Sequence, residues 1–423
     1  MKDIILVSLG LLLCSAGIFL FAGMYSFEFS SHSVKRIILG GAALIVVWGI
    51  ITVVFRHRAF IVNLNVSLIS FAVVAPFIAE IVIRSSIALG VDVFRNPKLY
   101  ADPLNDDDYW KLRYIWNPRN LATGNAERFV VDQLLGWSPP KTRDNTMGIV
   151  SDAPYSQDFR KPAILFYGDS FVYGATLVPI PQRIPQQLDR LLQTYPVYNY
   201  GVSAFGVDQI FLRFRETHSA FQHPIIIFGI LTEDIDRSVL NVHAAPKPRF
   251  ELQDGELDLQ NIPIPEDSAK WYMQNPVAIK SYFIALFRRT YQIVTGGSGR
   301  RIEKERVNKK IIEAVVNEAR KHDLPIVFVV FYSRHELEDV SWRETFLKNL
   351  LEELGIPYID TKAVLHDAAK EQSINIREFY LYRYNNDHHN ELGNCVIAAA
   401  ITGTLADKIG TEITSIKPAN CFD

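Results

Sequence analysis

The sequence is poor in cysteine and methionine, and neither sign of charge dominates it. Its 423 residues include 3 cysteines and 4 methionines, and the formal net charge is −2. This near-neutral charge gives no electrostatic reason to expect nucleic acid as a partner. The chain has no CxxC pair and no Cys/His cluster, so we expect neither a structural zinc site nor a disulfide framework. One bridge, from Cys395 to Cys421, is compatible with an extracytoplasmic domain.

Apolar sequence is abundant near the N-terminus. Three stretches, 4–24, 37–55 and 60–83, each approach the ~20 residues that a helix needs to cross a bilayer. The first two carry no charge, and a cleaved signal peptide is the alternative for the first. The third contains Glu80, so an interfacial or buried helix is its alternative. The sequence predicts about three transmembrane helices within residues 1–90.

The orientation of these helices follows from their number. With a cytoplasmic N-terminus, three spans place the large C-terminal domain outside. Lys and Arg are distributed on both sides of the predicted spans, so the positive-inside rule does not decide. We expect a multi-pass protein of the inner or plasma membrane with an extracytoplasmic C-terminal domain.

The rest of the chain divides into a linker with a lead-in segment, 91–150, and an α/β domain, 151–423. In the domain, short apolar runs alternate with amphipathic helical segments, and an insertion near 240–300 interrupts the alternation. Runs such as Ala163–Tyr167 and Ile326–Phe331 have no polar face. Strands buried on both faces need helices on both faces, which predicts a parallel doubly wound sheet. Such sheets place their sites at the carboxyl ends of the strands.

Three segments at predicted strand ends carry the residue types of nucleophilic catalysis. Ser170 follows the first strand in a Gly-Asp-Ser sequence, which is also a common turn composition. Gly201, after the next strand, can bring a backbone N–H close to a bound oxyanion. His388, just before the last helix, can reach the crevice as general base for Ser170. A solvated loop or a metal site is the alternative for His388 and His389, although this segment supplies few metal ligands.

In this order and on these elements, the three segments resemble the SGNH, or GDSL-like, family of hydrolases and acyltransferases. The resemblance covers about residues 130–410. The matching residues are Gly168, Asp169, Ser170, Gly201, His388, Asn390 and Gly393. The resemblance implies a flavodoxin-like three-layer fold and attack of the Ser170 hydroxyl on an acyl carbonyl, with no cofactor. The backbone N–H groups of Ser170 and Gly201 would form the oxyanion hole.

One departure from the family pattern concerns the oxyanion hole. Glu233 stands where the family has an asparagine amide donor, and a carboxylate cannot donate unless it is protonated. Either the hole has only two donors, or Thr232 substitutes, or Glu233 has another role.

A second departure concerns the residue that orients the histidine. The family has an aspartate two or three residues before it, where this chain has Asn386 and Asn385. Asp387 is directly adjacent to His388. The spacing to the following residues favours His388 as base, whereas an aspartate two residues before a histidine favours Asp387 with His389.

These observations predict a membrane-anchored, serine-dependent acyl-ester hydrolase or O-acyl(acetyl)transferase acting on a cell-envelope glycan or lipid. The substrate class follows only from the expected location and the resemblance. The competing hypothesis is a catalytically inactive module that binds glycan or helps to assemble an envelope complex, motivated by Glu233 and Asp387. The sequence names no protein partner.

Overall fold

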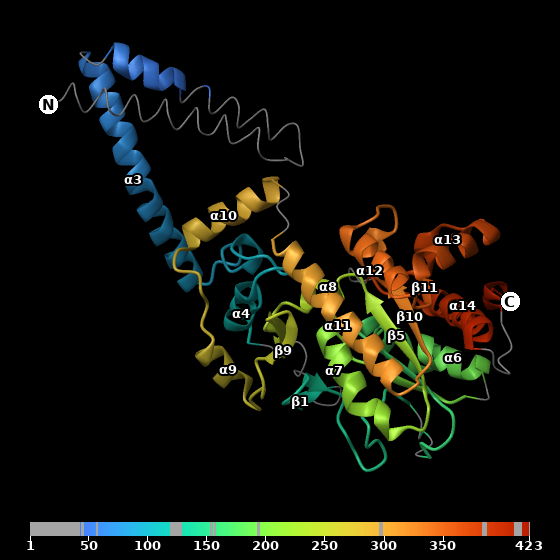
Figure 1. The fold of residues 1–423 in the computed structure, drawn as a ribbon. Coiled ribbons are helices and arrows are strands. Elements are labelled where there is room, and N and C mark those ends of the chain that lie inside the picture. Colours follow the sequence, from blue (N-terminus) through green and yellow to red (C-terminus); the bar gives the residue numbers. More distant parts are fainter. Residues whose placement is uncertain are drawn as a thin grey trace. The chain divides into compact units, whose positions relative to one another are not determined.

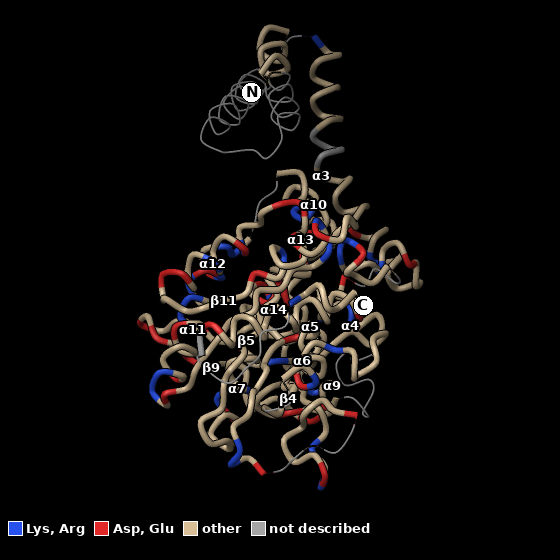
Figure 2. The backbone as a smooth tube through the Cα atoms, turned by 90° about the vertical axis from the view of Figure 1, so that its right-hand side faces the viewer, with Lys and Arg blue, Asp and Glu red and all other residues tan. Residues whose placement is uncertain are grey.

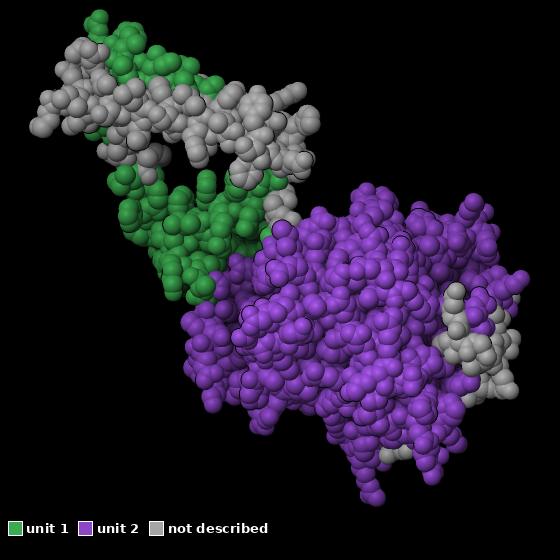
Figure 3. All heavy atoms as spheres, in the orientation of Figure 1, with its two compact units in different colours: residues 1–103, 277–299 green, residues 104–276, 300–423 purple. Residues whose placement is uncertain are grey.

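The computed structural model describes residues 43, 46–55, 58–118, 129–152, 155, 158–192, 195–295, 299–382, 387–409 and 417–422. The chain divides into two compact units (Figure 3). The first comprises residues 1–103 and 277–299, and the second comprises 104–276 and 300–423. The first unit therefore includes a segment of the region expected to be an insertion.

The second unit is built around a five-stranded parallel sheet (Figure 1). Its order is β11-β10-β5-β3-β4, so β3 pairs with both β4 and β5. The strands are β3 (Ile164–Gly168), β4 (Val197–Gly201), β5 (Ile225–Leu231), β10 (Ile326–Phe331) and β11 (Tyr358–Asp360). All four pairings are parallel, which confirms the parallel α/β sheet predicted from runs without a polar face.

Helices cover both faces of this sheet. Alternate side chains of each strand point to opposite faces and so enter two separate cores. In β3, Leu165 and Tyr167 belong to one core, and Ile164 and Phe166 belong to the other. The first core is closed by α7 (Val207–Thr217), α11 (Arg301–Lys321) and α12 (Trp342–Glu353). The second is closed by α6 (Ile184–Leu192), α13 (Thr361–Gln372) and α14 (Glu391–Ile409). The sequence analysis did not predict α13.

Smaller elements complete the second unit. Three two-stranded antiparallel pairs are β1 (Val130–Asp132) with β2 (Gly136–Ser138), β6 (Val242–His243) with β7 (Ala245–Pro246), and β8 (Arg249–Gln253) with β9 (Glu256–Gln260). The short helices are α4 (Asp107–Trp116), α5 (Ser170–Tyr173), α8 (Asp234–Arg237) and α9 (Ser268–Gln274). The 3-10 turns are η2 (Ile180–Gln182), η3 (His218–Ala220), η4 (Arg334–Glu336), η5 (Ile376–Phe379) and η6 (Pro418–Cys421).

A disulfide joins Cys395 in α14 to Cys421 in η6. This is the pair that the sequence left open for an extracytoplasmic domain. It ties the C-terminal turn to the helix that covers one face of the sheet.

The first unit contains α3 (Ala59–Ala88), η1 (Pro97–Leu99) and α10 (Tyr282–Thr295). The Glu80 carboxylate, on α3, accepts hydrogen bonds from the Ser281 hydroxyl (2.9 Å) and from the backbone N–H of Phe283 (2.8 Å). Arg84 donates to Glu80 at 2.6 Å and to the Lys280 carbonyl at 2.8 Å. Glu80 therefore satisfies the free N–H groups at the start of α10 and fixes that helix to α3.

The prediction of three membrane spans is tested only in part. The first apolar stretch and much of the second lie outside the described residues. Among the residues that the structure describes, α3 is the one helix long and apolar enough to cross a membrane. It carries no charge from Ala59 to Ala79, whereas Figure 2 shows charges spread over the second unit. Only 7% of its apolar window is buried, so the third stretch is not a buried core helix.

Candidate active site

Ser170 lies at the carboxyl end of β3, an interior strand of the sheet, where α5 begins. Asp169 caps this short helix, because its side chain accepts a hydrogen bond from the Phe171 N–H at 2.8 Å. Gly168 permits the sharp turn, since a Cβ there would lie 2.3 Å from the Val172 side chain. The strand β3 and the Asp169 cap together hold the Ser170 hydroxyl at the carboxyl end of the sheet.

The structure brings His388 to this serine. Its Nε2 lies 2.7 Å from the Ser170 Oγ, within the range expected of a nucleophile and its base. The backbone of the histidine segment is fixed by hydrogen bonds from Leu381 N–H to the His388 carbonyl and from Asn390 N–H to the Phe379 carbonyl, both 2.9 Å. The His388 ring stacks on Phe171, with centroids 4.7 Å apart.

The electrostatic surroundings of His388 favour its neutral form. Burial lowers the pKa of His388 from its ordinary value, and the Arg237 cation lowers it further. The carboxylates of Asp169 and Asp387 oppose this shift. A neutral imidazole at pH 7 is able to accept the serine proton.

A buried ionic cluster lies behind Ser170. The sequence analysis did not predict it. The Arg237 guanidinium, at the end of α8, donates to Asp169 Oδ2 at 3.0 Å and to Asp234 Oδ1 at 2.5 Å. Asp169 Oδ2 also accepts from the Ser170 hydroxyl at 3.2 Å. Burial raises the pKa of Asp234 and the neighbouring Asp169 raises it further, whereas Arg237 opposes the shift. The charged run after β5, residues 233–237, was the only sequence signal for this cluster.

Gly201 lies beside α5, but its backbone N–H is already engaged. It donates to the Asn199 side-chain oxygen at 2.9 Å. A Cβ at Gly201 would lie 2.1 Å from the Tyr173 backbone nitrogen, so glycine allows β4 to approach α5 closely.

The turn that follows Gly201, Val202 to Phe205, also lies beside Asp169. Arg237 donates both to Asp169 and, at 3.0 Å, to the Phe205 carbonyl. Ala204 in this turn has φ 68°, a left-handed conformation that is costly for alanine and is often found near functional sites. Alanine is not a turn-favouring residue, so no sequence pattern predicted this conformation.

Glu233 follows β5 at the N-cap position of α8, without a side-chain capping hydrogen bond. Its Oε1 lies 3.3 Å from His335 Nε2 and accepts from the Ser333 hydroxyl at 3.4 Å. The hydroxyl of Thr232 is buried and donates to Glu336 Oε2 at 2.5 Å. Glu233 thus has polar partners at the end of β10, and the Thr232 hydroxyl is directed into the interior.

Asp387 and His389 both differ in their surroundings from His388. The Asp387 carboxylate lies 3.6 Å from Arg334 Nε and 3.8 Å from His335 Nδ1. His389 is 2% exposed and packs on Tyr380, and within the described residues neither of its ring nitrogens has a hydrogen-bond partner. Burial lowers the pKa of His389 to about 3. The asparagines at 385 and 386 lie outside the described residues.

Comparisons with known proteins give distant structural matches only. No protein-family model matches the chain, and no curated protein matches it. Solved structures that it resembles include a putative G-D-S-L family lipolytic protein from Desulfitobacterium hafniense, at 13% identity and a TM-score of 0.34, covering 58% of this chain and 100% of that one.

Two further solved structures match at the same level. They are a member of the lipolytic protein G-D-S-L family from Veillonella parvula (14% identity, TM-score 0.34, 59% of this chain and 98% of that one) and a lipase/acylhydrolase from Enterococcus faecalis (12%, 0.34, 58% and 96%). At these values the likeness supports no conclusion about activity, and the functional argument rests on the geometry of the site.

Proposed function

We propose that the second unit is a serine-dependent acyl-ester hydrolase or acyltransferase, with Ser170 as nucleophile and His388 as general base. The observation that carries this proposal is the 2.7 Å separation of Ser170 Oγ and His388 Nε2 at the carboxyl end of β3. Such a hydrogen bond lets the imidazole remove the hydroxyl proton as the oxygen attacks.

The reaction then has two acyl-transfer steps. Ser170 Oγ bonds to the acyl carbon while its proton passes to His388 Nε2, and the same proton goes to the departing alcohol. The acyl-serine is next attacked by water or by a second hydroxyl group, whose proton His388 accepts and returns to Ser170. Water as acceptor gives a hydrolase, and a sugar hydroxyl gives a transferase.

Two groups supply the electrostatic support in this proposal. The cation formed on His388 is stabilised by the Asp169 and Asp387 carboxylates, which both favour its protonated form. For the oxyanion we propose the Ser170 N–H and the backbone N–H of Ser203 or Ala204. The Gly201 N–H already donates to Asn199, and the N–H groups of Val202 and Phe205 donate to the carbonyls of Gly168 and Val202. Glu233 has no role as an oxyanion donor in this proposal, because its carboxylate contacts His335 and Ser333.

We also propose that the first unit attaches the enzyme to a membrane, with its domain outside the cytoplasm. The apolar helix α3 supports the attachment. A row of exposed apolar side chains on α10, which Glu80 joins to α3, adds to that support; the row consists of Ile284, Phe287, Tyr291 and Val294, 43–69% exposed. The Cys395–Cys421 disulfide supports an oxidising compartment. The substrate proposed for this location is an acylated envelope glycan or a lipid ester.

The test is labelling of the full-length protein with a fluorophosphonate, together with hydrolysis of p-nitrophenyl acetate. We expect wild type to be labelled, Ser170→Ala to lose labelling, and His388→Ala to slow it strongly. Ser219→Ala, at an exposed position of η3, is the matched control and should be labelled as wild type is. Equal labelling of wild type and Ser170→Ala would exclude Ser170 as the nucleophile.

The inactive binding module is the second candidate. It is favoured by the Asp387 carboxylate, which lies on Arg334 and His335, and by Glu233 in place of an amide donor. Absence of both labelling and hydrolysis in a folded wild-type protein would support this candidate against the enzyme.

A further inference from the structure

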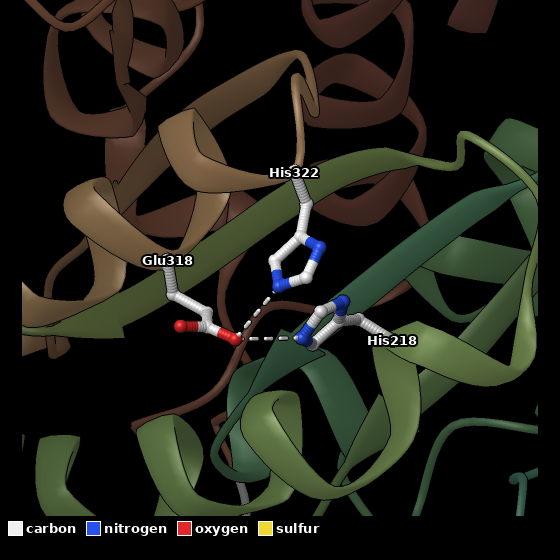
Figure 4. A group of neighbouring side chains, drawn as sticks. All are labelled: His218, Glu318 and His322. Atoms are coloured by element: carbon white, nitrogen blue, oxygen red, sulfur yellow. Dashed lines mark hydrogen bonds and ion pairs between the residues drawn. The ribbon is translucent and has the colours of Figure 1, made fainter.

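A second cluster of histidine and carboxylate side chains lies in the second unit, on the helices that cover one face of the sheet (Figure 4). His218 begins η3, directly after α7, and Glu318 and His322 lie one turn apart at the end of α11. The Glu318 Oε1 atom is 3.3 Å from His218 Nε2 and 3.3 Å from His322 Nε2. All three ligand atoms lie within 4.8 Å of one another.

These distances suit a transition-metal ion. Ligand atoms about 2.0–2.1 Å from a tetrahedral zinc ion lie about 3.4 Å from one another, close to both measured His–Glu separations. The His322 side chain is 41% exposed, and a small rotation of its ring would bring the third ligand atom in. Two histidines and one glutamate are a known zinc ligand set that leaves a fourth position for water.

The exposure of the three side chains increases from His218 to Glu318 to His322, as suits a metal site that opens to solvent on one side. The His218 side chain is 4% exposed and is held by its contact with the Phe214 ring, whose centroid is 4.7 Å away. Glu318 is 22% exposed and His322 opens to solvent. The ion has one rigid ligand and an open path of entry.

We propose that His218, Glu318 and His322 bind a zinc ion that links the end of α7 to the end of α11. His218 precedes β5, so the cluster lies toward the amino end of that strand, while Glu233 and the crevice follow its carboxyl end. The ion therefore has no part in acyl transfer; it links two helices of one layer and keeps a fourth, solvent-facing position for water. The three ligands come from segments about 100 residues apart, which is why no sequence motif marks the site.

The test uses full-length protein freed of metal with EDTA and titrated with ZnCl2 by calorimetry. We expect one zinc ion per chain and a higher thermal midpoint, because a ligand that binds only the folded state stabilises it. His322→Ala should weaken binding by at least roughly tenfold, the loss typical even for residues that only support a metal ligand. Mg²⁺ should give no effect, since it prefers oxygen ligands.

Two control variants separate this site from other histidines. His366→Ala removes an exposed histidine from α13 and should bind zinc as wild type does. His388→Ala should also bind zinc normally, so failure of the proposed catalysis and failure of the zinc site give different results. Glu318→Gln, which keeps the side-chain shape, should weaken binding as His322→Ala does. Wild type without zinc binding, or a His322→Ala variant that binds as tightly as wild type, would overturn the proposal.

Discussion

At the scale of single residues, the Ser170 hydroxyl lies between two acceptors. His388 Nε2 is 2.7 Å away and Asp169 Oδ2 is 3.2 Å away, so the histidine is the closer acceptor for the hydroxyl proton of Ser170. The Asp169 carboxylate also accepts a hydrogen bond from Arg237, so its charge is already compensated without the Ser170 hydroxyl. This arrangement favours transfer of the serine proton to the imidazole.

The surroundings of His388 predict the acid limit of activity. Burial and Arg237 lower its pKa below the ordinary value of 6.5, and only the neutral ring accepts the serine proton. On acidification, kcat/KM should therefore stay high through pH 6.5 and fall only at lower pH. The measurement is the pH profile of kcat/KM for p-nitrophenyl acetate between pH 4 and 8, which reports the free enzyme. An acid limb centred above pH 6.5 would contradict this assignment.

The position of Asp387 predicts a mild effect of its removal. Its carboxylate lies 3.6 Å from Arg334 Nε and 3.8 Å from His335 Nδ1, so these two side chains compete with His388 for its charge. Asp387→Asn should lower kcat by about tenfold at most, far less than the roughly 10⁴-fold loss seen when a Ser-His-Asp triad loses its carboxylate. His388→Ala serves as the reference for full loss. A loss near 10⁴-fold in Asp387→Asn would assign Asp387 the triad role.

At the scale of secondary structure elements, the site is formed where β3, β5 and β10 end. Ser170 follows β3, Glu233 follows β5, and Ser333 and His335 follow β10. The Arg237 cluster ties α8 to α5 beneath them, because Asp169 caps α5 and Asp234 opens α8. The cluster is therefore a link between two elements of the site as well as a support for one side chain.

This link predicts a large stability cost when its cation is removed. Arg237→Met leaves the buried carboxylates of Asp169 and Asp234 without their partner, which should lower the free energy of unfolding by about 3–5 kcal/mol. The matched control is Arg377→Met, whose ion pair with Glu338 is exposed and should be worth less than about 1 kcal/mol. Urea unfolding followed by circular dichroism measures both. Equal losses in the two variants would show that the buried cluster contributes no more to the free energy of unfolding than an exposed ion pair does.

At the scale of the whole molecule, the chain is two units with different surfaces. The second buries its apolar residues in two cores on either side of the sheet. In the first, many apolar side chains of α3 and α10 are exposed, among them Phe77 at 70% and Phe287 at 69%. An exposed apolar surface of this kind is typical of contact with lipid or protein. It agrees with the proposed attachment to a membrane.

The disulfide predicts how the second unit responds to reducing conditions. Cys395 and Cys421 are 26 residues apart, and closing a loop of that length stabilises the folded state by about 3.5 kcal/mol. Cys421→Ser should lower the thermal midpoint in non-reducing buffer by the corresponding amount. In dithiothreitol, wild type should unfold at the same temperature as the variant. A variant as stable as wild type without reductant would mean that the bridge adds no stability.

The sequence by itself determined the features that follow from local periodicity. Apolar runs without a polar face fixed the strands at β3 and β10 and the parallel sheet, since such strands need cover on both faces. The Gly-Asp-Ser sequence after β3 placed Ser170 at a strand end for the same local reason. The helix α13 was not foreseen because few of its residues are strongly apolar.

Only the tertiary structure decided which distant side chains meet. His389 pairs with Tyr380 in an extended bridge, where neighbouring side chains point to opposite sides, so one histidine faces Ser170 and the other enters the core. That choice depends on the register of a pairing that the sequence does not state. The partners of Arg237 and the meeting of His218 with α11 depend likewise on contacts between segments about 70 and 100 residues apart. Local patterns determine the faces of an element, and only packing between elements brings its polar residues together.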